Sequence, residues 1–329
     1  MALISLVFPI FNEEAVLPVL IARLEALLPT LELNGDQIEV LFINDGSRDG
    51  SLGQLRELVQ TRSWVRVLSF SRNFGHQVAV TAGMHHARGA AVVLLDADLQ
   101  DPPELLPEMI RLWRDEGWEV VYGKRRSREG ETAFKLLTAA IFYKTLQRLT
   151  SVAIPENTGD FRLMDRKVVD ALNTMGEQHR FLRGMAAWVG FKQHALEYDR
   201  PARAAGETKY PFRKMFKLAM DAITGFSYAP LKLSRDLGIF IALAAIAYGV
   251  VQAARYAIAP NSFEPGWTSI IVVLSLLSGV QLVTLGLIGE YIGRIYDEVK
   301  GRPLYLLSEK LGFRDEDPSQ SQSTNSRPS

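Results

Sequence analysis

Two carboxylates one residue apart, Asp96 and Asp98, follow the apolar run Val92–Leu95. Pro102 and Pro103 come soon after, and prolines end a strand and suit the first turn of a helix. If the strand continues to the two carboxylates, its alternation places both on the same side. Two like charges that close repel each other unless a cation or a proton lies between them, and oxygen ligands suit Mg²⁺ or Mn²⁺. A solvated, helix-capping loop has the same pattern, so the surrounding chain must discriminate between the two.

Strands and helices alternate through the first part of the chain. We expect strands at 3–8, 38–43, 65–70, 91–95 and 119–122, and helices at 13–28, 52–59, 76–87 and 103–115. This order predicts an α/β fold, with a Rossmann-like, mostly parallel sheet that carries helices on both faces. Ligands of such sheets bind beyond the carboxyl ends of the strands.

Polar clusters stand at four of these strand ends. They cover residues 9–14, 44–50, 71–75 and the segment that starts at Asp96. Each cluster alone is typical of turns and helix caps. Four clusters on one edge of a sheet indicate a single site. The chain has neither a Gly-x-Gly-x-x-Gly after a strand nor a Gly-x-x-x-x-Gly-Lys-Ser/Thr loop, so a nucleotide must be held in another way.

Composition limits the classes of function. The 329 residues include 37 basic and 37 acidic side chains, so no overall basic field favours a nucleic-acid partner. The absence of cysteine excludes disulfides and thiolate metal sites. The first eight residues lead directly into a predicted strand, and we expect no signal peptide. Residues 315–329 are rich in Ser, Gln, Asp and Pro, which predicts disorder.

Three motifs together resemble those of a known enzyme family. They are Pro9-x-Phe11-Asn12-Glu13, Asn44-Asp45-Gly46-Ser47 and the eight residues from Asp96 to Pro103. They resemble family 2 glycosyltransferases of the GT-A fold. Within that family the chain is similar to the polyprenyl-phosphate glycosyltransferases, which include dolichol-phosphate mannose synthase and bactoprenol glucosyltransferases. The resemblance covers about residues 3–312.

The resemblance implies roles for the donor half of the site. The nucleotide pocket would be lined by Pro9, Asn12, Glu13 and Asp45, with Asp45 bonded to the base or ribose. Asp98 and Gln100 would bind Mg²⁺ or Mn²⁺, with Asp96 close by. The metal would neutralise the diphosphate of a nucleotide sugar and improve the leaving group.

Further motifs would form the acceptor half. Thr158-Gly159-Asp160-Phe161-Arg162-Leu163 resembles the acceptor-side motif of the family, in which Asp160 is the candidate base. Gly206-Glu207-Thr208-Lys209-Tyr210 resembles a motif whose Lys, here Lys209, would hold the acceptor phosphate. Lys124 and Arg125 follow the fifth expected strand, and Arg200 and Arg203 lie on a loop that would close over the donor.

The chemistry favours charge neutralisation over strong base catalysis. A lipid phosphate has its second pKa near 6 and is largely a dianion at pH 7, so it is already a nucleophile. The harder task is to bring an anionic acceptor to an anionic donor. Four cations would do this, and Asp160 would orient or assist; the four are Lys124, Arg125, Arg162 and Lys209.

Two long apolar runs follow about residue 230. Residues 237–258 and 270–292 are each long enough to cross a bilayer. Cations flank the pair, whereas residues 259–269 contain no Lys or Arg, which predicts both ends in the cytoplasm. Mixed apolar and basic stretches at 131–152 and 210–228 are typical of interfacial helices. We therefore expect a cytoplasmic catalytic domain at 1–230, a transmembrane region at 231–300 and a cytoplasmic tail at 301–329.

These features predict a multi-pass enzyme of the inner membrane. It would transfer one sugar, with inversion, from a nucleotide sugar to polyprenyl (undecaprenyl) phosphate for cell-envelope glycosylation. UDP-glucose is the favoured donor and GDP-mannose the alternative. The other hypotheses are a non-catalytic scaffold that binds nucleotide sugars and a transporter. A homo-oligomer is compatible with the resemblance, although no residue fixes the number of copies. The chain has no Gln-x-x-Arg-Trp motif, which argues against a processive synthase.

Overall fold

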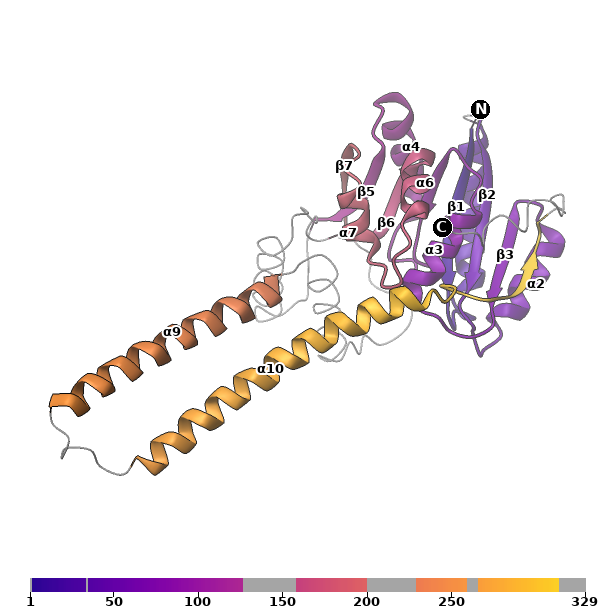
Figure 1. The fold of residues 1–329 in the computed structure, drawn as a ribbon. Helices are drawn as coiled ribbons and strands as arrows, with labels where there is room; N and C mark the ends of the chain where they lie inside the picture. Colours follow the sequence, from indigo (N-terminus) through magenta and orange to yellow (C-terminus); the bar gives the residue numbers. More distant parts are fainter. Residues whose placement is uncertain (1, 34, 127–157, 200–228, 259–265, 314–329) are drawn as a thin grey trace. The chain divides into compact units, whose positions relative to one another are not determined.

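The computed structural model describes residues 2–33, 35–126, 158–199, 229–258 and 266–313 (Figure 1). The chain divides into two compact units. One unit contains an eight-stranded sheet with its helices and also includes the chain from Pro303 onward. The other contains two long helices, α9 and α10.

The sheet has a parallel centre and antiparallel additions. Its order is β7-β5-β6-β4-β1-β2-β3-β8. Strand β1 pairs in parallel with β2 and β4, and β2 pairs in parallel with β3, whereas β6 and β8 run antiparallel to their neighbours. The prediction of a mostly parallel α/β sheet is therefore confirmed. The strands are β1 Leu3–Ile10, β2 Gln37–Asn44, β3 Val65–Phe70, β4 Ala91–Leu94, β5 Val120–Arg125, β6 Thr158–Asp165, β7 Gln193–Tyr198 and β8 Leu307–Leu311.

Helices cover both faces of the sheet. One core joins the side chains of Leu6 and Phe8 to apolar residues of α1, α2 and α4. On the other face α3 packs against β1, where a Cβ atom on Gly83 would lie 2.1 Å from Val7 Cγ1. The helices of this unit are α1 Leu17–Leu33, α2 Ser51–Thr61, α3 His76–His86, η1 Pro103–Leu105, α4 Leu106–Asp115, α6 Arg166–Thr174 and α7 Leu182–Trp188.

Two of the differences from the predicted boundaries affect residues of the expected site. Helix α1 begins at Leu17 rather than Glu13, because the amides of Glu13 and Glu14 bind Ser51 and Asp49 and hold this segment in a turn. Strand β5 continues to Arg125 instead of ending at residue 122. Parallel pairing with β7 extends it, so Lys124 and Arg125 belong to the strand and not to a following turn.

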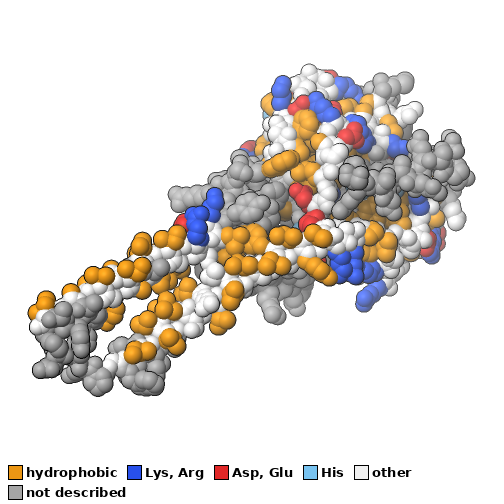
Figure 2. All heavy atoms as spheres, viewed as in Figure 1, with side chains coloured by type: hydrophobic (Ala, Val, Ile, Leu, Met, Phe, Trp, Pro, Cys, Tyr) orange, Lys and Arg blue, Asp and Glu red, His pale blue; other side chains and the backbone are white. Residues whose placement is uncertain are grey.

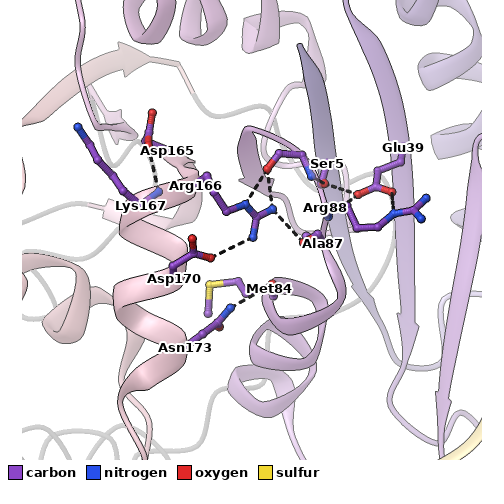
Figure 3. A network of polar contacts seen from close by, with 11 residues as sticks. Ser5, Glu39, Met84, Ala87, Arg88, Asp165, Arg166, Lys167, Asp170 and Asn173 are labelled. Carbon is purple, nitrogen blue, oxygen red and sulfur yellow. Dashed lines mark hydrogen bonds and ion pairs between the residues drawn. The ribbon is translucent and has the colours of Figure 1, made fainter. Parts of the chain in front are cut away.

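A polar network ties the amino ends of the central strands to α3 and α6 (Figure 3). The Ser5 hydroxyl donates to Glu39 at 2.5 Å and accepts from the Gly89 amide at 2.8 Å. The Arg166 guanidinium donates to the carbonyl oxygens of Ala87 and Gly89. The network therefore fixes the connection between α3 and β4, at the edge of the sheet opposite the strand ends that carry the motifs.

The chain rejoins the sheet after the two long helices. Strand β8 pairs antiparallel with β3, and Tyr305 stacks on Phe70 with a centroid distance of 5.1 Å. The Ser71 amide also donates to the Leu306 carbonyl at 2.9 Å. The sequence predicts only a tail at 301–329, whereas the structure has an edge strand there. The strand is hard to recognise from the sequence, because it is short and mixes apolar and charged residues.

The second unit consists of α9, Ala229–Ile258, and α10, Trp267–Lys300. Segments Leu231–Val251 and Leu276–Lys300 are long and apolar enough to cross a membrane. Figure 2 shows hydrophobic side chains along both helices. The predicted apolar runs coincide with these helices, whereas the interfacial helices expected at 131–152 and 210–228, and the tail from 315, lie outside the described residues.

Candidate active site

The loops after β1 and β2 are locked together. Asn12 adopts a left-handed backbone conformation with φ of 57°, which asparagine tolerates better than most residues. Its amide donates to Ser47 Oγ at 3.0 Å, and its side-chain oxygen accepts from the Arg48 amide at 2.8 Å. Pro9 lies inside β1 opposite Ile43. The first two motifs thus form one rigid corner, and the Asn12 side chain is used to hold it.

Asp45 organises the turn after β3. Its carboxylate is buried and accepts hydrogen bonds from the Asn73 side chain and from the amides of Phe74 and Gly75 at 2.6–2.9 Å. Burial raises the pKa of Asp45, although these amides oppose the shift. Gly46 has φ of 66°, and a Cβ atom there would lie 2.5 Å from the Arg72 backbone. The Asn-Asp-Gly-Ser motif therefore requires its glycine, and Asp45 is oriented toward the turn.

The Asp-x-Asp segment is a turn and not a strand end. Strand β4 ends at Leu94, and Leu99 has φ of 59°. The strand stops before it reaches Asp96 and Asp98, so strand alternation does not determine the side on which either carboxylate lies. Asp98 accepts from the Gln100 amide at 3.1 Å, and so the turn is closed by one of its own carboxylates.

Negative charge accumulates around Asp96. Burial raises its pKa, and with the carboxylates of Asp101, Asp160 and Asp98 brings it to about 6, although the charge of His76 opposes the shift. A cation would relieve this charge. Among the described residues no group of three or more His, Cys, Asp or Glu side chains is arranged to hold a metal ion. Two carboxylates and the Gln100 side-chain oxygen nevertheless fit Mg²⁺ or Mn²⁺, which commonly take their other ligands from phosphates and water.

Asp160 is a fully engaged carboxylate on β6. It accepts from Arg183 Nε at 2.8 Å, Gln77 Nε2 at 2.9 Å and His76 Nε2 at 3.1 Å. Burial alone would raise its pKa, but Arg183 and His76 hold it well below the usual value. Asp160 is therefore ionised at neutral pH, with both oxygens occupied by donors. This arrangement suits an anchor better than the candidate base predicted from the sequence.

His76 connects the two halves of the site. Its Nε2 atom lies 3.6 Å from Asp96 Oδ1 as well as 3.1 Å from Asp160 Oδ2. Burial alone would lower the pKa of His76, but the two carboxylates raise it to about 9. The imidazolium charge also acts on Asp45. The motifs of the second, fourth and sixth strands thus converge on one histidine at the start of α3.

The predicted cations are arranged differently from one another. Arg162 is buried and donates to the Gly159 carbonyl at 3.1 Å, and burial lowers its pKa to about 10. The Arg125 guanidinium lies against Gly159 and bonds to Tyr198. Lys124 instead pairs with Glu197 at 3.0 Å near the surface. Lys209 and Arg203, like Arg200, lie outside the described residues.

Sequence reasoning missed His76, Gln77 and Arg183. The first two directly follow the polar cluster at 71–75 and were treated as the start of an ordinary helix. Their position at the carboxyl edge of the sheet was the available signal. No comparable signal marks Arg183, because no strand or helix was predicted around it and it could not be assigned to an edge of the sheet.

The family model of glycosyl transferase family 2 matches residues 5–172, and the model of the GtrB C-terminal hairpin matches residues 229–295. The chain belongs to glycosyl transferase family 2. It is therefore a glycosyltransferase with a mixed, mostly parallel sheet, joined to a hairpin of two apolar helices that associates with membranes. The predicted family is confirmed.

Full-length relatives carry both parts. This glycosyltransferase is 50% identical over 309 residues to a protein of Bacillus subtilis (strain 168) named uncharacterized glycosyltransferase YkcC, and the match covers 94% of each chain. It is 40% identical over 306 residues to the SfII prophage-derived bactoprenol glucosyl transferase of Shigella flexneri, covering 93% of this chain and 97% of the relative. Among solved structures, glucosyl-3-phosphoglycerate synthase from Mycobacterium tuberculosis, in complex with Mn²⁺, UDP and phosphoglyceric acid, superposes with a TM-score of 0.47 at 18% identity, covering 68% of this chain and 76% of that chain.

Proposed function

We propose that this glycosyltransferase transfers one sugar from a nucleotide sugar, preferably UDP-glucose, to polyprenyl phosphate at the cytoplasmic face of the membrane, with inversion at the sugar. One observation carries the proposal. The bridge from Asp96 through His76 to Asp160 joins the predicted donor and acceptor motifs, in a chain that also contains an apolar hairpin.

The donor half would handle a diphosphate. Asp98 and Gln100, with Asp96 beside them, would hold Mg²⁺ or Mn²⁺. The bound metal supplies neutralisation of the diphosphate and so improves the nucleoside diphosphate as a leaving group. The rigid corner formed by Asn12, Glu13 and the Asp45 segment would shape the nucleotide pocket beside Pro9.

The acceptor half would handle a phosphate monoester. Such a phosphate is mostly a dianion at neutral pH and needs no strong base to attack C1 of the sugar. The main requirement is to neutralise charge where two anions meet. Arg125 and Arg162, which both lie against Gly159, would supply positive charge there. Lys124, Lys209 and Arg203 would add to the positive charge. Asp160 would position these groups.

The lipid acceptor fits the organisation of the chain. A hairpin that associates with the membrane would keep the catalytic unit near lipid headgroups. In addition, a relative whose alignment covers 93% of this chain is named a bactoprenol glucosyl transferase. The name of this relative supports a polyprenyl phosphate as the acceptor and a glucose nucleotide as the donor.

Chain connectivity supports two crossings. Strand β7 precedes the hairpin and β8 follows it, and both belong to one sheet. The number of crossings between them must then be even. Lys232 and Arg235 lie in the first two turns of α9, before the apolar run 237–258, and Arg302 follows α10. Residues 259–269 contain no Lys or Arg, which favours a cytoplasmic location for both ends.

The test is transfer by membranes that contain this chain. They are incubated with undecaprenyl phosphate, Mg²⁺ and a panel of radiolabelled nucleotide sugars that includes UDP-glucose and GDP-mannose. We expect a lipid-linked product from UDP-glucose, and much less product at the same Mg²⁺ concentration from an Asp98→Asn variant made to the same level. If only GDP-mannose gives a product, the donor is GDP-mannose and not UDP-glucose. If no donor gives a lipid-linked product, the proposed function is wrong.

A further inference from the structure

Three elements that are distant in sequence meet at the side chain of Gln77. Its Nε2 atom donates to Asp160 Oδ2 at 2.9 Å, and its Oε1 atom accepts from the Leu182 amide at 3.1 Å. Gln77 belongs to α3 and Asp160 to β6, and Leu182 is the first residue of α7. One half-buried carboxamide thus connects a helix, a strand and a second helix.

These contacts form a closed ring. Arg183, the residue after Leu182, donates from Nε to the other oxygen of Asp160 at 2.8 Å. The amino end of α7 has no side-chain cap on the preceding residue Phe181, so Gln77 satisfies one of the amide groups that a helix leaves without an internal partner. Gln77 therefore places Arg183 as well as Asp160.

The ring has a fixed polarity. The carboxylate of Asp160 only accepts hydrogen bonds and the Leu182 amide only donates, so a neutral group with a donor at one end and an acceptor at the other is needed. Glutamine supplies both. A glutamate of the same shape still accepts from Leu182 but turns a negative oxygen toward Asp160.

We propose that Gln77 is a positioning residue for the acceptor side of the site: it holds Asp160 and, through α7, Arg183 in the arrangement that receives the acceptor phosphate. This inference rests on the proposed function, because it takes the Asp160 side as the acceptor half. It adds a residue, and a helix, that the motifs do not contain.

Two substitutions separate position from simple packing. Gln77→Glu removes the donor and adds a charge, and Gln77→Met keeps the approximate shape without either hydrogen-bonding group. We expect KM for undecaprenyl phosphate to rise about tenfold or more in Gln77→Glu and by less in Gln77→Met. Both variants lose the hydrogen bond to the charged Asp160, but only Gln77→Glu adds a second negative charge beside it. KM for the donor should stay within twofold. Gln37→Glu, the same chemical change at an exposed residue at the start of β2, is the matched control and should change neither KM.

A double variant tests the contact without relying on activity. Gln77→Glu combined with Asp160→Asn exchanges donor and acceptor while the total charge is unchanged. We expect its thermal unfolding midpoint to lie above that of Gln77→Glu alone, with a non-additive cycle as for residues in contact.

Several results would overturn the inference. They are an acceptor KM within twofold of wild type in Gln77→Glu, equal changes in donor and acceptor KM, or strictly additive unfolding midpoints. If wild-type membranes transfer no sugar at all, the proposed function fails, and the double-variant cycle still decides whether Gln77 positions Asp160.

Discussion

The guanidinium group of Arg125 occupies the space where a side chain on Gly159 would stand: a Cβ atom there would lie 2.9 Å from Arg125 Nη2. The Thr-Gly-Asp motif therefore needs a glycine at its second position, because any side chain there would displace the guanidinium group of Arg125. Because the far end of an arginine is flexible, an alanine would displace the guanidinium without breaking the strand.

Gly159→Ala should thus impair transfer more than folding. We expect kcat to fall on the order of 100-fold, the effect of a misplaced group about 1 Å from its position, with a small change in unfolding midpoint. The measurement is lipid-linked product formation together with thermal unfolding. Gly53→Ala is the control, since a Cβ atom there meets nothing within 4 Å, and it should leave transfer unchanged. Equal rates for the two variants would contradict the role of Gly159.

Asp160→Asn should remove a pH-dependent contribution to stability. The folded-state pKa of Asp160 lies well below 3.8, so the unfolded state binds the proton more readily. The stabilisation is present above about pH 3.8 and is lost as the pH falls toward the folded-state pKa. At pH 7 the variant should lose about 3 kcal/mol, because Arg183 and His76 lose their charged partner.

Thermal unfolding of detergent-solubilised protein between pH 7 and pH 3 measures this difference. The gap between wild type and Asp160→Asn should narrow as the pH falls below 4. Asp115→Asn, at an exposed position near the end of α4, provides the control and should follow wild type throughout. A gap that stays constant with pH would mean that ionisation of Asp160 does not stabilise the fold.

Metal removal should stop transfer reversibly. EDTA should abolish product formation, and Mg²⁺ or Mn²⁺ should restore it, because the carboxylates around Asp96 would otherwise repel the diphosphate. Asp98→Asn should require at least about tenfold more metal for half-maximal activity, since it loses one charged oxygen ligand. Full activity in EDTA would exclude the metal that we infer for the Asp96 turn.

The network in Figure 3 should govern stability rather than catalysis. Arg166→Ala leaves the carbonyl oxygens of Ala87 and Gly89 without their guanidinium donor, at a cost of about 1–3 kcal/mol. Lys167→Ala, which removes only an exposed pair with Glu119, should cost less than about 1 kcal/mol. Both variants should transfer sugar normally at temperatures where they remain folded. A loss of transfer in folded Arg166→Ala would show that the two edges of the sheet are coupled.

The contact that Tyr305 makes with the sheet after α10 should contribute measurably to the free energy of unfolding. Tyr305→Ala removes a ring stacked on Phe70 and should cost about 1–3 kcal/mol. Leu306→Ala, at a neighbouring side chain that is 55% exposed, is the matched control and should have little effect. Similar unfolding midpoints for the two variants would mean that the aromatic contact is not stabilising.

The sequence predicted the parts of the fold that have strong periodic patterns. Strand β3 was predicted at its observed bounds, and α3 within one residue, because buried apolar runs and a flanking turn mark them. The two apolar helices were equally visible. Strands β6, β7 and β8 were not predicted, since their pairing depends on partners that are distant in the sequence.

The sequence predicted the motif residues of the site, but it did not predict the contacts that join one motif to another. Residue types at the strand ends pointed to Asp45 and Asp96, and the family resemblance pointed to Asp160. No spacing rule states that one histidine lies between Asp96 and Asp160. Strand alternation does not set the positions of Asp96 and Asp98, because the strand ends at Leu94 and a turn follows at 97–98. Contacts such as Gln77 with Leu182 form only after the sheet has brought α3 and α7 together.

Strand β8 also has a consequence for the order of biosynthesis. It leaves the ribosome after both apolar helices, yet it completes the edge of the sheet at β3, whose strand is made within the first 70 residues. Until then β3 presents unpaired backbone groups, and exposed strand edges invite association with other chains. The catalytic unit can therefore be completed only after the hairpin has been synthesised.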